Sequence, residues 1–73
     1  MDAPLLQFIR HLRHHGVAVS PSETLDAMQV AAALGYADRS LLYHGLRTSL
    51  AKSEEDQEAF ARCFGQFFQF DPP

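Results

Sequence analysis

Aromatic side chains are concentrated near the carboxyl end of this 73-residue chain. The last five phenylalanines of the chain are Phe60, Phe64, Phe67, Phe68 and Phe70. The first four of these five follow the spacing i, i+4, i+7 and i+8, which places them on one face of a helix. Ser53 precedes this segment as an N-cap, Asp56 completes a near capping box, and Asp71-Pro72-Pro73 ends it. The pattern predicts a helix over about residues 54–69 that presses an aromatic face against other elements.

Start and stop signals predict two further helices. Pro4 suits the first turn of a helix, where its missing N–H would have no partner, and Gly16 suits a left-handed end. These signals predict a helix over about residues 4–15. Asp38 is the expected N-cap of another helix, over about residues 39–50.

The clearest local signal in the chain is Ser20-Pro21-Ser22-Glu23. Ser20 is the expected N-cap, Pro21 takes the first helical position, and Glu23 completes a capping box. The predicted helix runs over about residues 21–34 and ends at Gly35.

Leucines and alanines at helical spacing supply the predicted packing faces of the two middle helices: Leu25, Met28, Ala31, Ala32 and Leu34 in one, and Leu41, Leu42, Leu46 and Leu50 in the other. Gly45 lies inside the second of these helices, where glycine costs on the order of 1 kcal/mol against alanine, and a close helix crossing would explain it. We therefore predict an all-α fold, a compact bundle or orthogonal array of four short helices at about 4–15, 21–34, 39–50 and 54–69. Residues 1–73 form a single small helical domain in this prediction.

Composition narrows the class of protein. The only cysteine, Cys63, cannot form an internal disulfide, and we expect it to be a buried thiol in a reducing compartment. The first residues lack the features of a signal peptide, and no apolar stretch approaches the roughly 20 residues that span a bilayer. The net charge of −3 argues against a nucleic-acid binder. We expect a cytoplasmic protein that binds no nucleic acid and has no membrane span.

The histidines are the best candidates for metal ligands in the sequence. His11 and His15 lie four residues apart on one helix face, a spacing that can hold a metal ion, and His14 and His44 could add ligands. No cysteine or carboxylate lies nearby in the sequence to complete a tetrahedral set. A solvated basic helix end accounts for these residues, so we predict no metal site and no cofactor.

Two other patterns bear on chemistry. Asp38-Arg39-Ser40 resembles the phosphopantetheine site of acyl carrier proteins, but Arg39 separates the aspartate from Ser40, and Asp38 as an N-cap is the simpler account. The carboxylates at the start of the last helix match its dipole and indicate a solvated cluster; they are Glu54, Glu55, Asp56 and Glu58. We predict that the chain is not an enzyme.

Read in order, the segments resemble the N-terminal helical region of CoxE-like proteins that contain a von Willebrand factor A domain. Three stretches carry the resemblance over about residues 5–70. They are Phe8-Ile9-Arg10-His11-Leu12-Arg13 with Gly16-Val17-Ala18-Val19-Ser20-Pro21; Glu23-Thr24-Leu25-Asp26-Ala27 with Ala33-Leu34-Gly35 and Asp38-Arg39; and Tyr43, Leu46-Arg47-Thr48-Ser49-Leu50, Glu55-Asp56 and the phenylalanines.

The resemblance implies a partner role rather than a reaction. Proteins similar to these work beside AAA+ ATPases of the MoxR group in remodelling or maturing other enzymes, often by helping to insert metal cofactors. The metal site of that family lies in an Asp-x-Ser-x-Ser loop of the A domain, and this chain has no such loop. The resemblance thus implies the leading domain of a longer protein, or a free-standing version of that domain. The implied partners are a MoxR-type ATPase, a client enzyme or the following domain of its own chain.

We expect contact with such a partner through Phe68 and Phe70, at the end of the aromatic helix, and through the basic residues Arg10 and Arg13. Phe70 lies off the main aromatic face and is the best candidate for an exposed anchor, whereas Phe60, Phe64 and Phe67 are expected in the core. Two alternatives stay open: a carrier-like or small ligand-binding four-helix protein, and a homo-oligomeric structural helper. The oligomeric state is not predicted.

Overall fold

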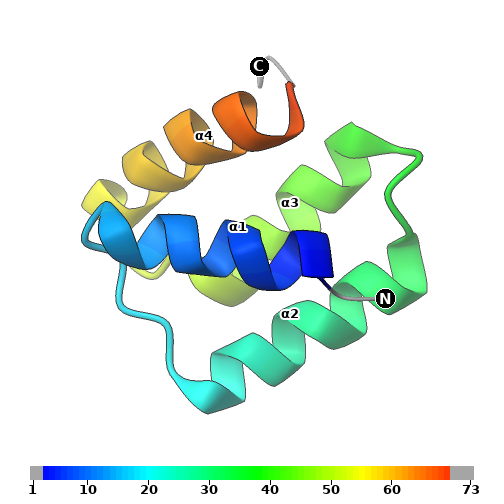
Figure 1. The fold of residues 1–73 in the computed structure, drawn as a ribbon, viewed down its shortest axis with the longest axis horizontal. Coiled ribbons are helices and arrows are strands. Elements are labelled where there is room, and N and C mark those ends of the chain that lie inside the picture. Colours follow the sequence, from blue (N-terminus) through cyan, green and yellow to red (C-terminus); the bar gives the residue numbers. More distant parts are fainter. Residues whose placement is uncertain (1–2, 70–73) are drawn as a thin grey trace.

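Each of the predicted start signals begins a helix in the computed structural model, which describes residues 3–69. The helices are α1 (Ala3–His14), α2 (Pro21–Leu34), α3 (Arg39–Leu50) and α4 (Glu54–Phe68) (Figure 1). The predicted all-α fold of four short helices is confirmed, and no helix boundary differs from its predicted position by more than one residue. Phe70 and Asp71-Pro72-Pro73 lie outside the described residues.

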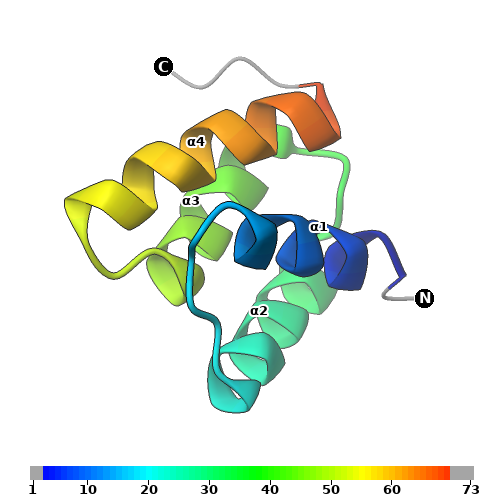
Figure 2. The same cartoon turned by 60° about the vertical axis from the view of Figure 1, so that its left-hand side comes forward.

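The helices form two pairs that close around one core. α2 packs against α3, α1 packs against α4, and α3 also contacts α4 while α1 also contacts α2. α1 and α4 run in opposite directions, and α2 and α4 lie on opposite sides of the molecule in both views (Figures 1 and 2). The end of α1 is thereby brought to the start of α4.

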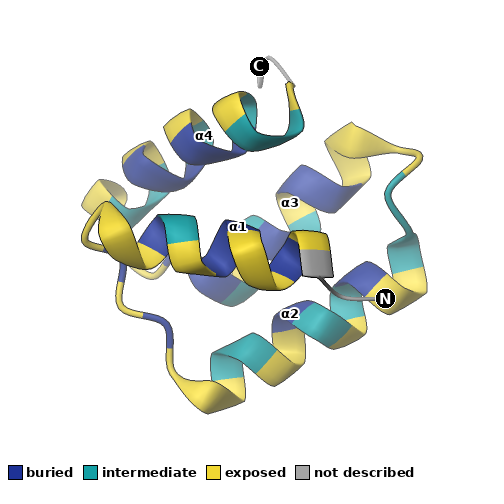
Figure 3. Ribbon diagram, viewed as in Figure 1, coloured by how far each residue is buried: buried dark blue, intermediate teal, exposed yellow. Residues whose placement is uncertain are grey.

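Aromatic rings fill the centre of the core. Phe8, Phe60 and Phe64 are fully buried, and the ring of Phe8 meets the other two edge-on, with centroids 5.5 and 5.7 Å apart. Buried and exposed stretches alternate along α1 and α4 (Figure 3). Burying each ring contributes about 1.5–3 kcal/mol, and such edge-on geometry adds about 0.5–1.5 kcal/mol per pair. The largest fully buried aliphatic side chains complete this core: Leu5, Ile9, Leu12, Leu42, Leu46 and Leu50.

Capping at the start of α2 is as predicted. The Ser20 backbone N–H donates to Glu23 Oε1 at 2.9 Å, and the Glu23 N–H donates to Ser20 Oγ at 3.2 Å, so the capping box is complete. The start of α4 is only half of such a box. Ser53 Oγ accepts from the Asp56 N–H, but Asp56 Oδ2 accepts from the Lys52 N–H at 3.3 Å. The side chain expected to close that box thus binds the residue before the cap.

The end of α1 is stabilised by a glycine in the left-handed region. Gly16 has φ +91°, a conformation that costs residues with a Cβ atom more than it costs glycine. The Val17 N–H donates to the Leu12 carbonyl and the Gly16 N–H to the Arg13 carbonyl, which is the hydrogen-bond pattern of a Schellman motif. This turn directs the chain from α1 toward the start of α2.

Gly45 explains how α2 and α3 approach so closely. A Cβ atom at Gly45 would lie 2.8 Å from Val30 Cγ1 and 2.9 Å from Leu34 Cδ1. Both atoms belong to α2, so the close helix crossing expected from the sequence is confirmed.

Three residues of the predicted packing faces are exposed instead. Leu25 is 59% exposed, Leu41 is 50% exposed, and Ala32 is also exposed. The buried side chains of α2 are the small residues Ala27 and Ala31, because little space remains between α2 and its neighbours at the crossing. The packing face of α2 is therefore narrower than leucine spacing predicts.

Candidate functional site

Phe68, the predicted contact residue at the end of α4, lies partly inside the core. Its ring is half-buried, with centroids 4.7 Å from Phe64 and 5.3 Å from Phe8. On its other side Tyr36 stacks against it at 6.2 Å, and the Arg39 guanidinium donates a hydrogen bond to the Phe68 carbonyl. One part of Phe68 is therefore held by the bundle, while the rest remains accessible beside Arg39.

The other aromatic predictions have different outcomes. Phe60 and Phe64 are buried as expected. Phe67, also expected in the core, is only half-buried, and its ring lies 5.7 Å from Phe8 and 6.3 Å from His11. Phe70 lies outside the described residues, so its expected role as an anchor stays a prediction.

The two arginines predicted as contact residues differ in their surroundings. Arg13 Nη2 donates to the Val19 carbonyl at 2.9 Å and so ties the end of α1 to the connection that leads into α2. Arg10 is exposed on α1. Within residues 3–69, no hydrogen bond or ion pair joins either arginine to Phe68. Phe68 is therefore not linked to either arginine by a polar contact, and Phe70 lies outside the described residues.

Ser40, the carrier-like candidate, lies exposed in the first turn of α3. The neighbouring Asp38 is the N-cap of that helix, since its Oδ1 accepts from the Leu41 N–H at 3.1 Å. The simpler interpretation of Asp38 as a cap is therefore confirmed.

Lys52 connects three separate parts of the chain. Its ammonium group donates to the Ala18 carbonyl at 2.6 Å and to Glu23 Oε1 at 2.9 Å, and its backbone N–H binds Asp56. Two hydrogen bonds hold the pKa of Glu23 below its ordinary value of 4.5. The bond from the Ser20 N–H has the larger effect, and the bond from Lys52 has the next largest. This polar contact fastens the start of α2 to the connection between α3 and α4.

Acidic and basic residues meet where α1 ends and α4 begins. A surface cavity of about 330 Å³ lies there, lined by His15, Gly16, Val17, Glu55, Asp56, Glu58, Ala59 and Arg62. Three carboxylates face one guanidinium and one imidazole in this lining, so the cavity is mildly acidic. The carboxylates match the helix dipole of α4, as expected from the sequence.

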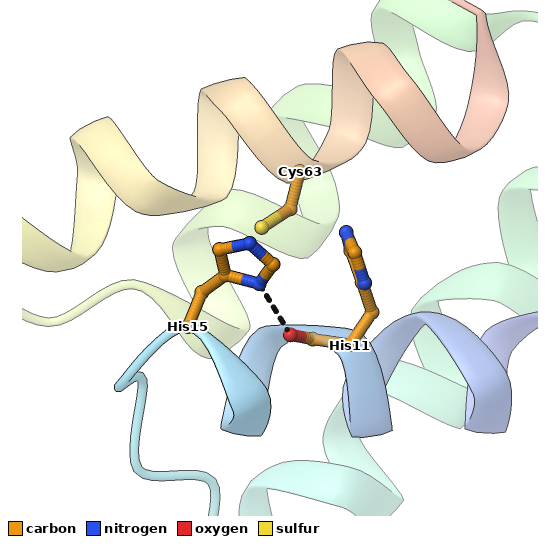
Figure 4. Close-up of side chains that lie close together, drawn as sticks. All are labelled: His11, His15 and Cys63. Atoms are coloured by element: carbon orange, nitrogen blue, oxygen red, sulfur yellow. Dashed lines mark hydrogen bonds between the residues drawn. The ribbon is translucent and has the colours of Figure 1, made fainter.

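Cys63 lies against the histidine pair, which the sequence did not indicate (Figure 4). One ligand atom each from His11, His15 and Cys63 lie within 4.8 Å of one another. Cys63 is fully buried, as expected, and burial raises the pKa of its thiol, an effect that Arg62 opposes. Within residues 3–69, this is the one group of potential metal ligands that includes a thiol.

A partial signal for this arrangement exists in the sequence. Cys63 lies three residues after Phe60 and one before Phe64, so helical spacing places it on the aromatic face of α4. His11 and His15 lie three and seven residues after Phe8, on the edge of the packing face of α1. Spacing shows that these residues border the core, but not that the two edges meet.

Fold and site together define a small α-helical bundle domain, built around an aromatic core and assembled without a disulfide. The family model described as the CoxE N-terminal helical bundle domain matches residues 5–70, and the chain belongs to this family. This confirms the resemblance identified from the sequence. No curated protein and no solved structure matches the chain. No described helix is both long enough and apolar enough to cross a membrane.

Proposed function

We propose that this chain is a non-enzymatic protein-interaction module of a CoxE-family protein, which assists a MoxR-type AAA+ ATPase in remodelling or maturing a client enzyme, including insertion of its metal cofactor. The observation that carries the proposal is the family match over residues 5–70, nearly the whole chain. In this proposal the module is cytoplasmic and leads a longer protein that continues into a von Willebrand factor A domain.

The fold is consistent with a binding role. The buried side chains are almost all apolar, and Tyr43 is the one buried residue with a hydroxyl within residues 3–69. Large apolar side chains remain on the surface, with Leu6 44% and Leu41 50% exposed. Exposed apolar side chains can contribute to a protein interface.

The contact surface in this proposal is the end of α4 together with the basic face of α1. Phe68 and Phe70 supply the aromatic contacts, and Arg10 and Arg13 supply positive charge. Arg10 is free to meet an acidic partner residue, whereas Arg13 also holds Val19, so a change at Arg13 alters both binding and the turn after α1. Arg10 is therefore the cleaner residue for a test of charge.

The test measures binding of the chain to the MoxR-type ATPase of its own organism by isothermal titration calorimetry. Phe70→Ala and Arg10→Glu should each weaken binding by about tenfold or more, because aromatic and arginine residues dominate interface energies. Leu25→Ala is the control, since Leu25 is exposed on α2, on the side of the molecule away from α4 (Figures 1 and 2). All three variants should keep the thermal midpoint of the parent.

Two outcomes would overturn the proposal. The first is a parent chain that does not bind the ATPase and leaves its rate of ATP hydrolysis unchanged. The second is equal binding by the parent, Phe70→Ala and Arg10→Glu, which would place the contact elsewhere. Concentration-dependent self-association that is lost with Phe70→Ala would instead support a homo-oligomeric helper, and sedimentation velocity detects it.

A further inference from the structure

We propose that His11, His15 and Cys63 form a binding site for Zn²⁺ between α1 and α4, with the fourth position open to the surface. The inference is independent of the proposed ATPase partner. It rests on the placement of the three side chains, the orientation of one imidazole and the surroundings of the cluster.

The three ligand atoms lie nearly as close together as a zinc site requires. Zn–N distances of about 2.0–2.1 Å and a Zn–S distance of about 2.3 Å place the ligand atoms of a tetrahedral site about 3.5 Å apart. The three ligand atoms here lie within 4.8 Å of one another without an ion. The two imidazoles are the accessible members of the cluster, since His15 is exposed and His11 is half-buried. The thiol lies on the buried side, so the site opens through the histidines.

The orientation of the His15 ring also suits a metal ligand. Its Nδ1 lies 3.0 Å from the His11 carbonyl oxygen, which can only accept, so Nδ1 carries the proton (Figure 4). The proton-free nitrogen of the neutral ring is then Nε2, on the side of the ring nearer to Cys63 (Figure 4). Metal-binding histidines use the same kind of bond from the second nitrogen to a carbonyl, which fixes the ring and its tautomer.

The two helices that carry the ligands are packed against each other. His11 and His15 lie one helical turn apart, and Cys63 projects from α4, which packs directly against α1. The edge-on contacts of Phe8 with Phe60 and Phe64 hold the two helices together on the buried side of the cluster. A metal site needs its ligands held by the fold in this way.

The charges around the cluster favour a cation. The two histidines lie at the carboxyl end of α1, where the helix dipole favours a cation. The adjoining cavity includes His15 and the carboxylates of Glu55, Asp56 and Glu58 against the guanidinium of Arg62. Of the three proposed ligands, only His15 lines this cavity, whose volume of about 330 Å³ has room for water beside that imidazole. In the proposed site, the ion enters from this side.

The donor set selects the ion. Thiolate and imidazole together suit zinc, whereas oxygen ligands suit magnesium and calcium. Three protein ligands with an open position are also a known arrangement for Zn²⁺. Binding replaces the thiol proton of Cys63 with the ion and releases that proton to solvent.

The test uses the reduced, metal-free 73-residue chain and Co²⁺ as a spectroscopic substitute for Zn²⁺. One Co²⁺ per chain should produce a sulfur-to-cobalt charge-transfer band and the ligand-field bands of tetrahedral cobalt, and Zn²⁺ should abolish both. His15→Ala should weaken binding by about 100-fold or more, because even second-shell changes cost about 10- to 100-fold. His14→Ala is the matched control, since His14 is the neighbouring exposed histidine and lies outside the cluster.

The two histidine variants are compared for folding and for their response to Zn²⁺. Both histidine positions are exposed, so both variants should fold, and circular dichroism verifies this. Zn²⁺ should raise the thermal midpoint of the parent and of His14→Ala but not that of His15→Ala. Equal affinities for His14→Ala and His15→Ala, absence of the charge-transfer band, or one ion shared by two chains in sedimentation would each overturn the site.

Discussion

The close crossing of α2 and α3 predicts that Gly45→Ala destabilises the domain, although alanine favours helices over glycine by about 1 kcal/mol. The added methyl group would lie 2.8 Å from Val30 Cγ1 and 2.9 Å from Leu34 Cδ1, both nearer than carbon atoms can approach. Leu34 can move the end of its side chain at little cost. Val30 cannot, because a β-branched side chain in a helix has essentially one χ1 rotamer.

The net effect follows from the two opposing terms. Overpacking typically costs about 1–3 kcal/mol, so subtracting the gain in helix propensity leaves a destabilisation of about 1 kcal/mol. For a domain of this length, that lowers the thermal midpoint by about 4–8 °C. Urea unfolding followed by circular dichroism measures the free energy, and an unchanged slope would show that only stability has changed.

A double-mutant cycle with Val30→Ala tests the stated cause. Removing the two methyl groups of Val30 should make Gly45→Ala neutral or stabilising, with a coupling energy of about 1 kcal/mol or more between the sites. Coupling below about 0.5 kcal/mol would mean that the sites are independent. That result, or a higher thermal midpoint for Gly45→Ala alone, would refute the inferred close approach of the helices.

Three further predictions concern the core, the caps and pH. Phe64→Ala should be the most damaging single truncation, at roughly 3–5 kcal/mol, and a melt like that of the parent would contradict it. Ser20→Ala should cost about 1 kcal/mol in urea unfolding, because the Glu23 N–H loses its acceptor; an unchanged midpoint would show that the cap is dispensable. The pKa of Glu23 is lowered by folding, so its contribution is complete above the ordinary value of 4.5 and is lost as pH falls through the lower, folded value. The free energy of unfolding of Glu23→Gln should therefore fall less steeply than that of the parent as the pH becomes acidic. An equal fall in both proteins would contradict the claim that folding lowers the pKa of Glu23.

Helix positions could be predicted from the sequence because their signals are local. A serine or aspartate cap and a glycine end each act within a few residues, so Ser20, Asp38 and Gly16 identify boundaries without knowledge of the fold. The half-formed box at Ser53 shows the limit of such signals. Whether Asp56 binds the N–H of Ser53 or of Lys52 depends on the path of the chain before the cap.

Burial of individual leucines could be predicted less well, because it depends on which helices are neighbours. Leu41 and Leu42 are adjacent in sequence, yet Leu42 is fully buried and Leu41 is half exposed. Helical spacing places them about 100° apart, and only the packed arrangement decides which of them faces α4 and the core. Gly45 carried the clearer signal, since an internal glycine indicates close approach even when the neighbour is unknown.

Sequence spacing could not predict the candidate metal cluster, because spacing does not give the relative register of two helices. His11, His15 and Cys63 each border an aromatic face, but a shift of α4 by one turn along α1 would move Cys63 by about 5.4 Å and separate the ligands. The register is set by the contacts of one ring, that of Phe8, with four rings of α4: Phe60, Phe64, Phe67 and Phe68. The same aromatic packing that stabilises a domain this small therefore also determines whether its only thiol can meet the two imidazoles, so ligand geometry and stability are coupled through one side chain, Phe8.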